Sequence, residues 1–538
     1  MPGMIVAPEA FAAEAGAMAL ARGGNAVDAA VTCAFAQGVL DPHDSSIGGY
    51  VTFNMHRPSD PPAVSTFLDG PAVAGSRTSP DMWVDRYIGP NPDGWGFFLR
   101  DKVNEYGYTS ICTPGIVRGL ATMLERWGTI SLADAVAPAA QIAADGFAVD
   151  NRVAGYWLAP AARPQQASIL EYVRANAEAS KIYLKPGGGP YLTGEIIRNP
   201  DYAATLRYLG EHGANDFYTG RLAARMAADL AANGAFVTAD DLANYRIRDV
   251  EPVVGTYRGH TVVSSQPPHG GPTLVEILNI LEGWDLRALG HNSAAYILRV
   301  AMAMNAAFAD RNPHLGDPDF VDVPLAWMTS RDRAAEWRAR IEAGELVDPA
   351  FGAPGPPTTT HVSVVDRDGT CVALTHSLGS SSGVITPGLG FMWNNSMVNF
   401  HPLPGHANSI APGKGRTTGM SPTIVYGGDG RPVLVIGAPG GTKIINSIAQ
   451  VIVNIVDFGM TPQEAVYAPR FDSQGGPILC QIRIPATVID GVRRRHPVTR
   501  LPMAHGGLAF VHAIGIDPAT GQLSGGAEAA TAGMAIEV

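Results

Sequence analysis

Cysteine is scarce in this sequence. Only four of the 538 residues are cysteines, and no two of them are close enough to form a CxxC motif: Cys33, Cys112, Cys371 and Cys480. Four widely separated thiols cannot cross-link a chain of this length. We therefore expect a reducing compartment and no disulfide framework.

Long apolar segments and clusters of positive charge are also missing. The longest apolar stretch, 26–40, is interrupted by Asp28 and Gln37 and is shorter than the ~20 residues that span a bilayer. The N-terminus shows no basic segment followed by an apolar one, so a secretory signal is not indicated. The longest basic run is 493–495 and the net charge is −11, which disfavours a phosphate-backbone partner. We expect a cytoplasmic protein that binds neither membranes nor nucleic acids.

Small and apolar residues are abundant instead. Hydrophobic residues make up 46% of the chain and charged residues 16%, with 62 glycines and 42 prolines. This composition excludes disorder, which requires low hydrophobicity and high charge. Apolar spacing typical of helices occurs mainly in the first part of the chain, at 9–20, 25–39, 132–145, 201–211, 222–233 and 293–310.

A strand-rich part follows the proline-rich segment 348–357. Residues 358–366 alternate between two faces, a turn follows at 367–369, and 370–377 return as a second strand, which predicts a β-hairpin. A second predicted hairpin joins 423–426 to 432–436, and a helix is predicted over 442–458.

The first candidate for chemistry is the segment 379–383, which matches the G-x-S-x-G pattern. A nucleophilic serine in this pattern needs a strand before it and a helix after it. The strand is present, but Thr386-Pro387-Gly388 cannot begin a helix. We therefore favour a Ser/Gly loop.

The second candidate is the glycine-rich segment 437–443 between a predicted strand and a predicted helix. It lacks the GxxxxGK[ST] spacing of a phosphate-binding loop. A Gly-Gly turn at the positive end of a helix can still present free N–H groups to an anion or a developing oxyanion. An ordinary tight turn is the alternative.

The third candidate is the threonine run 358–360. A threonine hydroxyl is a poor nucleophile unless a base lies beside it. If the chain cuts itself before a threonine, the new α-amino group, with a pKa near ~8, can be that base. This chemistry needs a threonine at the start of a strand after an accessible loop, as here. A threonine cluster that only favours β-structure is the alternative.

A resemblance distinguishes these candidates. Residues 359–366, Thr-Thr-His-Val-Ser-Val-Val-Asp, resemble the segment that opens the small subunit of γ-glutamyltranspeptidases, which are N-terminal nucleophile hydrolases made as one proenzyme. Similar blocks follow in the family's order at 22–30, 46–49, 113–119, 217–220, 241–245, 257–259, 278–283, 393–395, 420–424 and 437–442.

The resemblance implies a fold and a cleavage point. The fold is the α+β four-layer αββα sandwich, with two antiparallel sheets between helical layers. Cleavage of the Thr358–Thr359 bond would divide the chain into a large subunit, 1–358, and a small subunit, 359–538. The two subunits would remain associated as one globular unit.

The resemblance also implies catalytic roles. Thr359 takes the place of the nucleophile, Ser377 that of a second hydroxyl bonded to it, and Gly440 and Gly441 that of the oxyanion hole. No cofactor and no metal are implied, and His401 and His406, which have no metal-ligand spacing, are interpreted as surface loop residues.

The substrate-binding positions depart from the family pattern. Ser396 and Asn399 stand where the family has a Gln and an Asp that hold the α-amino group. Gly379 replaces an Asn, and Thr418 and Gly419 replace a Ser pair.

The segment 69–71, which aligns with the family arginine that binds the α-carboxylate, has no arginine, and Arg77 is the nearest. The segment 400–420 is shorter than in long-lid members, so a reduced lid is expected.

We therefore expect amide hydrolysis or acyl transfer through an acyl-Thr359 ester, with a γ-glutamyl or related small-molecule amide as the substrate, as in a glutathione hydrolase. The charge-assisted contacts to the α-amino group and to the α-carboxylate of a γ-glutamyl substrate are both lost. Each is worth ~1.5–3 kcal/mol, so we predict poor γ-glutamyl activity. The alternative is an amidohydrolase or a cephalosporin/glutaryl-type acylase acting on non-γ-glutamyl amides. A second alternative is an uncleaved, inactive binding homologue.

Overall fold

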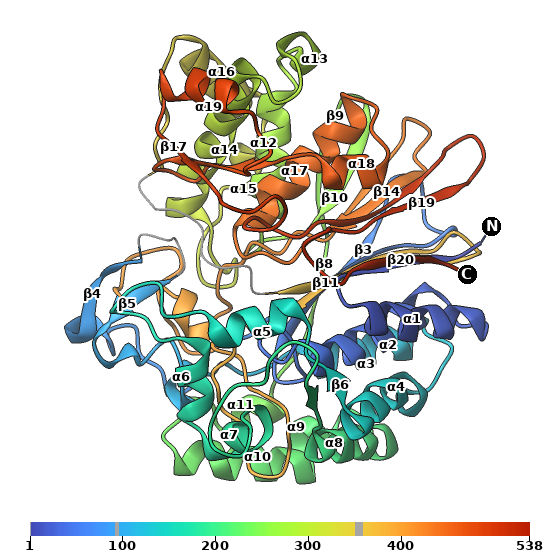
Figure 1. Cartoon of the computed structure of the whole chain (residues 1–538), viewed down its shortest axis with the longest axis vertical. Coiled ribbons are helices and arrows are strands. Elements are labelled where there is room, and N and C mark those ends of the chain that lie inside the picture. The colour runs from blue at the N-terminus through green and yellow to red at the C-terminus, as the bar shows by residue number, and fades with distance from the viewer. Residues whose placement is uncertain (1, 92–95, 350–358) are drawn as a thin grey trace.

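Two stacked antiparallel sheets lie between two layers of helices (Figure 1). The computed structural model describes residues 2–91, 96–349 and 359–538. The first sheet has seven strands, in the order β20 (Met534–Glu537), β1 (Met4–Ala7), β11 (Thr360–Val365), β12 (Cys371–Ser377), β2 (Tyr50–His56), β3 (Thr66–Gly70) and β8 (Arg248–Val250).

The second sheet has six strands. Their order is β19 (Leu523–Gly526), β18 (His512–Ile516), β14 (Pro432–Gly437), β13 (Thr423–Tyr426), β10 (His260–Ser264) and β9 (Val253–Tyr257). The two inner faces enclose a layer of buried apolar side chains that includes Val6, Val263, Val365, Ile424 and Ile514. Burial of alternate residues from both sheets is what joins them face to face.

Each outer face of the sandwich is covered by helices (Figure 1). The first sheet packs against a core formed with α1 (Ala10–Ala21), α2 (Ala26–Leu40), α3 (Ile116–Trp127), α4 (Leu132–Asp145) and α8 (Pro200–His212). The second sheet packs against α12 (Gly271–Leu281), α14 (Ala294–His314), α16 (Arg331–Glu342) and α17 (Lys443–Val456). The predicted αββα sandwich is therefore confirmed.

Shorter elements surround these layers. The helices are α5 (Asn151–Leu158), α6 (Ile169–Arg174), α7 (Ala177–Tyr183), α9 (Asp216–Thr219), α10 (Arg221–Ala232), α11 (Ala239–Ala243), α13 (Leu286–Leu289), α15 (Leu325–Met328), α18 (Pro462–Tyr467) and α19 (Ala486–Arg493). The strands are β4 (Tyr87–Pro90), β5 (Phe97–Leu99), β6 (Phe147–Ala148), β7 (Ile196–Ile197), β15 (Phe471–Asp472), β16 (Ile478–Cys480) and β17 (Val498–Arg500). No helix in the described ranges is both long and apolar enough to cross a membrane.

The predicted helices and hairpins are present with small shifts at their ends. The helix α2 begins as expected, because the Asn25 side chain accepts hydrogen bonds from the N–H groups of Val27 (2.9 Å) and Asp28 (3.1 Å), a standard N-cap. The predicted helix 293–310 continues to His314 as α14, and the predicted helix 442–458 is the shorter α17.

The two parts of the chain before and after residue 359 contribute strands to both sheets and interleave in the first. In the first sheet, β11 and β12 lie between β1 and β2. In the second, β9 and β10 from the first part extend the strands β13 and β14 from the second. The strand that follows Thr359 therefore lies in the middle of a sheet, where neighbours on both sides fix its position.

Candidate active site

Thr359 directly precedes β11 and lies beside the end of β12. The hairpin register pairs Thr360 with His376, so Thr359 lies opposite Ser377. The Thr359 hydroxyl donates to Ser377 Oγ at 3.3 Å, and the same oxygen accepts the N–H of Gly379 at 2.8 Å. The two hydroxyls that the family resemblance pairs are therefore in contact. Thr358, the other side of the expected cleavage, lies outside the described residues.

The Gly440–Gly441 turn connects β14 to the N-terminus of α17. Both glycines have positive φ, 149° and 61°. A Cβ at position 440 would lie 2.6 Å from the Cα of Ala509, so glycine is required there. Within the described chain, neither of these two N–H groups has a hydrogen-bond acceptor. Free donors at a helix N-terminus can stabilise an oxyanion.

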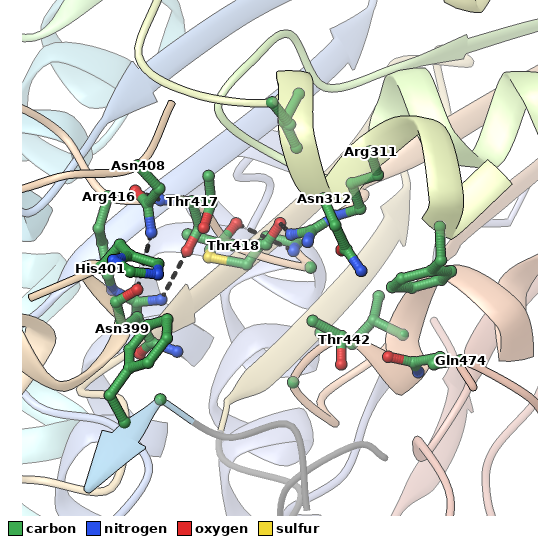
Figure 2. Close-up of a pocket in the computed structure, with 18 of the residues that line it drawn as sticks. Arg311, Asn312, Asn399, His401, Asn408, Arg416, Thr417, Thr418, Thr442 and Gln474 are labelled. Carbon is green, nitrogen blue, oxygen red and sulfur yellow. Dashed lines mark hydrogen bonds between the residues drawn. The ribbon is translucent and has the colours of Figure 1, made fainter. Parts of the chain in front are cut away.

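A pocket with a cavity of about 140 Å³ opens at this place (Figure 2). Thr359 and Gly441 line it, together with three of the predicted substrate-binding residues, Asn399, Thr418 and Gly419. Its other lining residues are Tyr50, Gly96, Phe97, Phe308, Arg311, Asn312, Leu315, His401, His406, Asn408, Arg416, Thr417, Met420, Thr442, Ile444 and Gln474.

Gly379 and Ser396, the other two predicted substrate-binding residues, are not among the residues that line the pocket. A Cβ at Gly379 would lie 2.3 Å from Asn395 Oδ1, which instead accepts the N–H of Ser380 at 2.9 Å. Ser396 is buried, and its N–H donates to Asn394 Oδ1 at 3.1 Å. Both positions support the pocket wall through backbone contacts.

The charge of the pocket differs from the expectation. Arg311 and Arg416 both line it, so the expectation that a substrate carboxylate would find no arginine is wrong. Gly415, the residue before Arg416, forms an antiparallel bridge with Val73. The segment 69–71 lacks an arginine, and parts of the chain distant in sequence supply the two arginines that line the pocket. Among the described lining residues, none is an aspartate or a glutamate.

Of the two histidines interpreted as surface loop residues, His406 is exposed in a loop as expected, whereas His401 is buried. Both line the pocket, their rings stack with centroids 3.5 Å apart, and His401 is buried. Burial lowers the pKa of His401 to about 4, so its ring is neutral at pH 7. In the described ranges, no three His, Cys, Asp or Glu side chains are grouped so that they could hold a metal ion.

The G-x-S-x-G segment forms a loop, as predicted. No helix follows it. The central serine, Ser381, is fully buried and does not line the pocket, and Ser382 Oγ donates to the carbonyl of Trp393 at 2.9 Å. The hydrogen bond of Ser382 stabilises the loop, and neither serine lines the cavity that contains Thr359.

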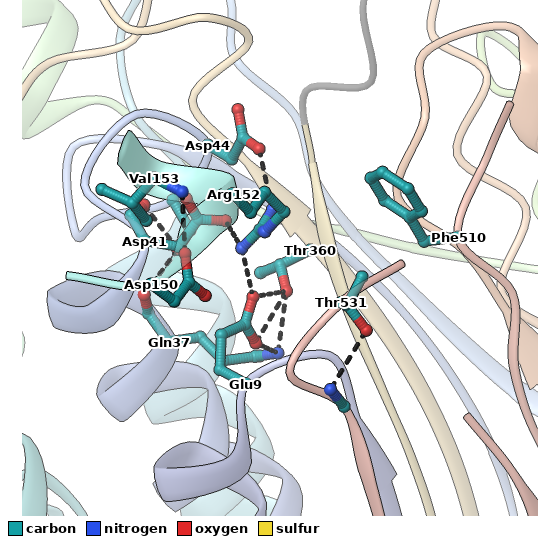
Figure 3. Close-up of polar contacts among 12 residues, drawn as sticks. Glu9, Gln37, Asp41, Asp44, Asp150, Arg152, Val153, Thr360, Phe510 and Thr531 are labelled. Carbon is teal, nitrogen blue, oxygen red and sulfur yellow. Dashed lines mark hydrogen bonds and ion pairs between the residues drawn. The ribbon is translucent and has the colours of Figure 1, made fainter. Parts of the chain in front are cut away.

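A buried ionic cluster lies beside the start of β11 (Figure 3). Arg152 contacts three carboxylates, Glu9 at 2.9 Å, Asp41 at 2.6 Å and Asp44 at 3.2 Å. The Thr360 hydroxyl donates to Glu9 Oε1 at 3.1 Å. The residue after the candidate nucleophile is therefore attached to a cluster in which three acids share one cation.

Gln37 joins this cluster to both strands of the hairpin. Its side-chain N–H group donates to Glu9 Oε2 at 2.7 Å, to Thr360 Oγ1 at 2.8 Å and to the carbonyl of His361 at 3.1 Å. Its oxygen contacts His376 Nε2 at 2.9 Å. The polar residue that interrupts the apolar stretch 26–40 thus holds the start of β11, which sequence analysis did not identify.

A threonine at the start of a central strand, a second hydroxyl bonded to it, and free N–H groups across a pocket define an N-terminal nucleophile hydrolase on an αββα fold. A family model described as Gamma-glutamyltranspeptidase matches residues 12–538. The chain belongs to the γ-glutamyltranspeptidase family and is an enzyme of the hydrolase and transferase type that this family comprises.

Individual relatives carry two kinds of name. The chain is 36% identical over 533 residues to the acylase ACY 1 proenzyme of Pseudomonas sp. (strain V22), covering 98% of this chain and 91% of the relative. It is 35% identical over 491 residues to the glutathione hydrolase proenzyme of Escherichia coli (strain K12), covering 88% and 81%. A cephalosporin acylase structure from Bacillus halodurans matches with a TM-score of 0.87 and 28% identity, covering 99% and 95%.

The oxyanion turn generates a first prediction. In Gly440→Ala, the new methyl group would displace the turn from Ala509, so we expect kcat to fall by ~10²-fold or more while KM changes little. Gly428→Ala is the matched control, because its Cβ would meet nothing within 4 Å. Steady-state kinetics on the amide substrate measure both variants, and a normal kcat in Gly440→Ala would exclude this turn from catalysis.

The buried cluster generates a second prediction. Burial raises the pKa of Glu9 from 4.5 to about 7, so the folded state binds this proton more tightly than the unfolded state does. The stability that this proton contributes is complete below pH 4.5 and is lost as the pH rises through 7. Replacing Glu9 by Gln, which does not titrate, should remove this loss, on the order of 2–3 kcal/mol between pH 5 and 8.

Denaturant unfolding of the wild type and of Glu9→Gln at pH 5 and pH 8 measures the effect. The exposed Glu14 on the same helix provides the control, since Glu14→Gln should follow the wild type at both values. Parallel pH profiles for the wild type and Glu9→Gln would contradict the raised pKa.

Proposed function

We propose that this chain is a self-processing amide hydrolase that acts through an acyl-Thr359 ester on amides whose acyl group carries no α-ammonium. The observation that supports it most is that Thr359, whose hydroxyl contacts Ser377 Oγ, lines the same pocket as Gly441 of the Gly440–Gly441 turn. These groups match the needs of acyl transfer: a nucleophile, a partner for its hydroxyl and an oxyanion hole.

Maturation would use the same groups as turnover. The Thr359 hydroxyl attacks the carbonyl carbon of residue 358, the peptide nitrogen leaves as the α-amino group of Thr359, and water hydrolyses the resulting ester. The fragments 1–358 and 359–538 would stay together because their strands interleave in the first sheet and pair with each other in the second. The names of the relatives as proenzymes support this processing.

In turnover, the new α-amino group takes the proton of the Thr359 hydroxyl as the oxygen attacks the substrate carbonyl. The N–H groups of Gly440 and Gly441 hold the oxyanion, and the proton passes to the leaving amine. Water then attacks the acyl-Thr359 ester in the same way, and releases the carboxylic acid. A positioned base of this kind contributes typically 10²–10⁴-fold to the rate.

The preference against an α-ammonium group comes from the lining of the pocket. Asn399 is neutral, and no acidic side chain lines the described part of the cavity. An ammonium group brought into this cavity would lose its hydration without gaining a carboxylate partner. A glutaryl-type acylase is therefore favoured over a γ-glutamyl hydrolase.

A third prediction tests the nucleophile. Purified wild type should run as two bands on a denaturing gel, and N-terminal sequencing of the smaller band should read Thr-Thr-His-Val-Ser. Thr359→Ala should remain one band and lose amide hydrolysis by ~10³-fold or more.

Ser381→Ala is the control for this experiment, because it removes the central serine of the G-x-S-x-G loop. It should mature and turn over as the wild type does. Wild type that stays as one band would instead support an inactive binding homologue. Near-normal hydrolysis by Thr359→Ala would contradict the mechanism.

A further inference from the structure

Two buried arginines face the active-site pocket without an acidic partner. Arg311 is 8% exposed and Arg416 is 4% exposed, and neither forms an ion pair within the described chain. In Figure 2 they enter the pocket from opposite sides, with Thr417 and Thr418 between them. Both guanidinium groups therefore border the cavity that contains Thr359.

The hydrogen bonds of the two arginines leave donors unused. Arg311 Nη2 donates to the carbonyl of Thr418 at 3.2 Å, and Arg416 Nη1 donates to the carbonyl of Thr417 at 3.0 Å. Arg416 Nη2 donates to the Tyr50 hydroxyl, and its guanidinium lies 4.7 Å from the centre of that ring. The Nε of each arginine is buried and has no acceptor.

A buried cation with no counter-charge is costly. Burial lowers the pKa of Arg311 to about 10, which still leaves it charged at pH 7. An uncompensated buried charge destabilises a protein strongly, whereas a ligand that brings a carboxylate supplies the missing charge and acceptor. Other buried arginines of this chain, such as Arg152 and Arg470, have carboxylate partners, so the two pocket arginines differ in kind.

We propose that Arg311 and Arg416 form a carboxylate subsite, and that the substrate is an amide of a short dicarboxylic acid. One carboxyl group of that acid forms the scissile amide at Thr359, and the other binds the guanidinium groups. This inference rests on the proposed function, whose acyl class it narrows. Guanidinium groups suit this role because their fixed N–H donors match the oxygens of a carboxylate.

The size of the cavity limits the length of the acyl group. A volume of about 140 Å³ is comparable to a ~150 Å³ cavity that admits benzene. We therefore expect a short acyl chain, of the length of succinyl or glutaryl. An α-ammonium group on the same chain would meet only neutral or positive side chains.

The experiment compares two substrates that differ only in charge. Glutaryl-p-nitroanilide carries the distal carboxylate, and 4-carbamoylbutanoyl-p-nitroanilide replaces it with a neutral amide of the same shape. The processed wild type should prefer the glutaryl compound by at least ~10-fold in kcat/KM, the lower limit for a charge-assisted contact. This arm needs no variant and therefore does not depend on the folding of a mutant.

Variants then assign the preference to the two arginines. Arg311→Gln and Arg416→Gln should each lower the glutaryl-to-carbamoyl ratio by ~10- to 100-fold, mainly through loss of the glutaryl compound. Arg431→Gln is the control, because Arg431 is exposed on a hairpin turn and pairs with Asp429. A purely structural role would lower both substrates together and leave the ratio unchanged.

The outcomes separate the two proposals. An unchanged ratio in either pocket variant overturns the carboxylate subsite. Processed wild type that fails to prefer the glutaryl compound, because it favours the neutral compound or hydrolyses neither, also overturns it and leaves the self-processing proposal intact. Wild type that stays uncleaved and hydrolyses neither compound overturns the proposed function itself.

Discussion

The antiparallel pairing of β11 with β12 is the constraint on which the site depends. The strand β11 pairs with β12 from Thr360 onward and with β1 from Ser363 onward, so its first residues are held by the ladder to β12 and the rest of the strand by ladders on both sides. The register places Thr359 opposite Ser377, and the cluster of Glu9, Gln37 and Arg152 holds Thr360. A weak nucleophile gains from such rigidity, since a correctly positioned hydroxyl needs no reorganisation before it attacks.

The hairpin of β11 and β12 and the helix α17 could be predicted because their signals are local. The catalytic roles of Thr359, Ser377, Gly440 and Gly441 came from the family resemblance and stay predictions. Alternation over 358–366, the turn at 367–369 and the glycines before α17 are each confined to a few residues. The hydrogen bonds of Gln37 could not be predicted in this way, because the partners of an isolated polar residue in an apolar helix depend on which strand packs against that helix. The polar groups around the start of β11 come from three segments that are separate in the sequence, those of Glu9, Gln37 and Arg152.

The positive charge of the pocket could not be predicted from local sequence signals either. Arg311 lies near the end of α14, and Arg416 in the segment before β13, so only the tertiary fold brings them to one cavity. Alignment of the segment 69–71 correctly indicated that no arginine is present there. It could not indicate that Arg311 and Arg416, from segments distant in sequence, line the same cavity. His401 was misassigned for the same reason.

Identification of the acylated residue tests the central claim most directly. The processed enzyme is quenched in acid during turnover of glutaryl-p-nitroanilide, and the small fragment is analysed by intact mass and peptide mapping. The account predicts one added glutaryl group, carried by the hydroxyl of Thr359 at the new N-terminus. An acyl group attached to any other residue, Ser381 included, would contradict it.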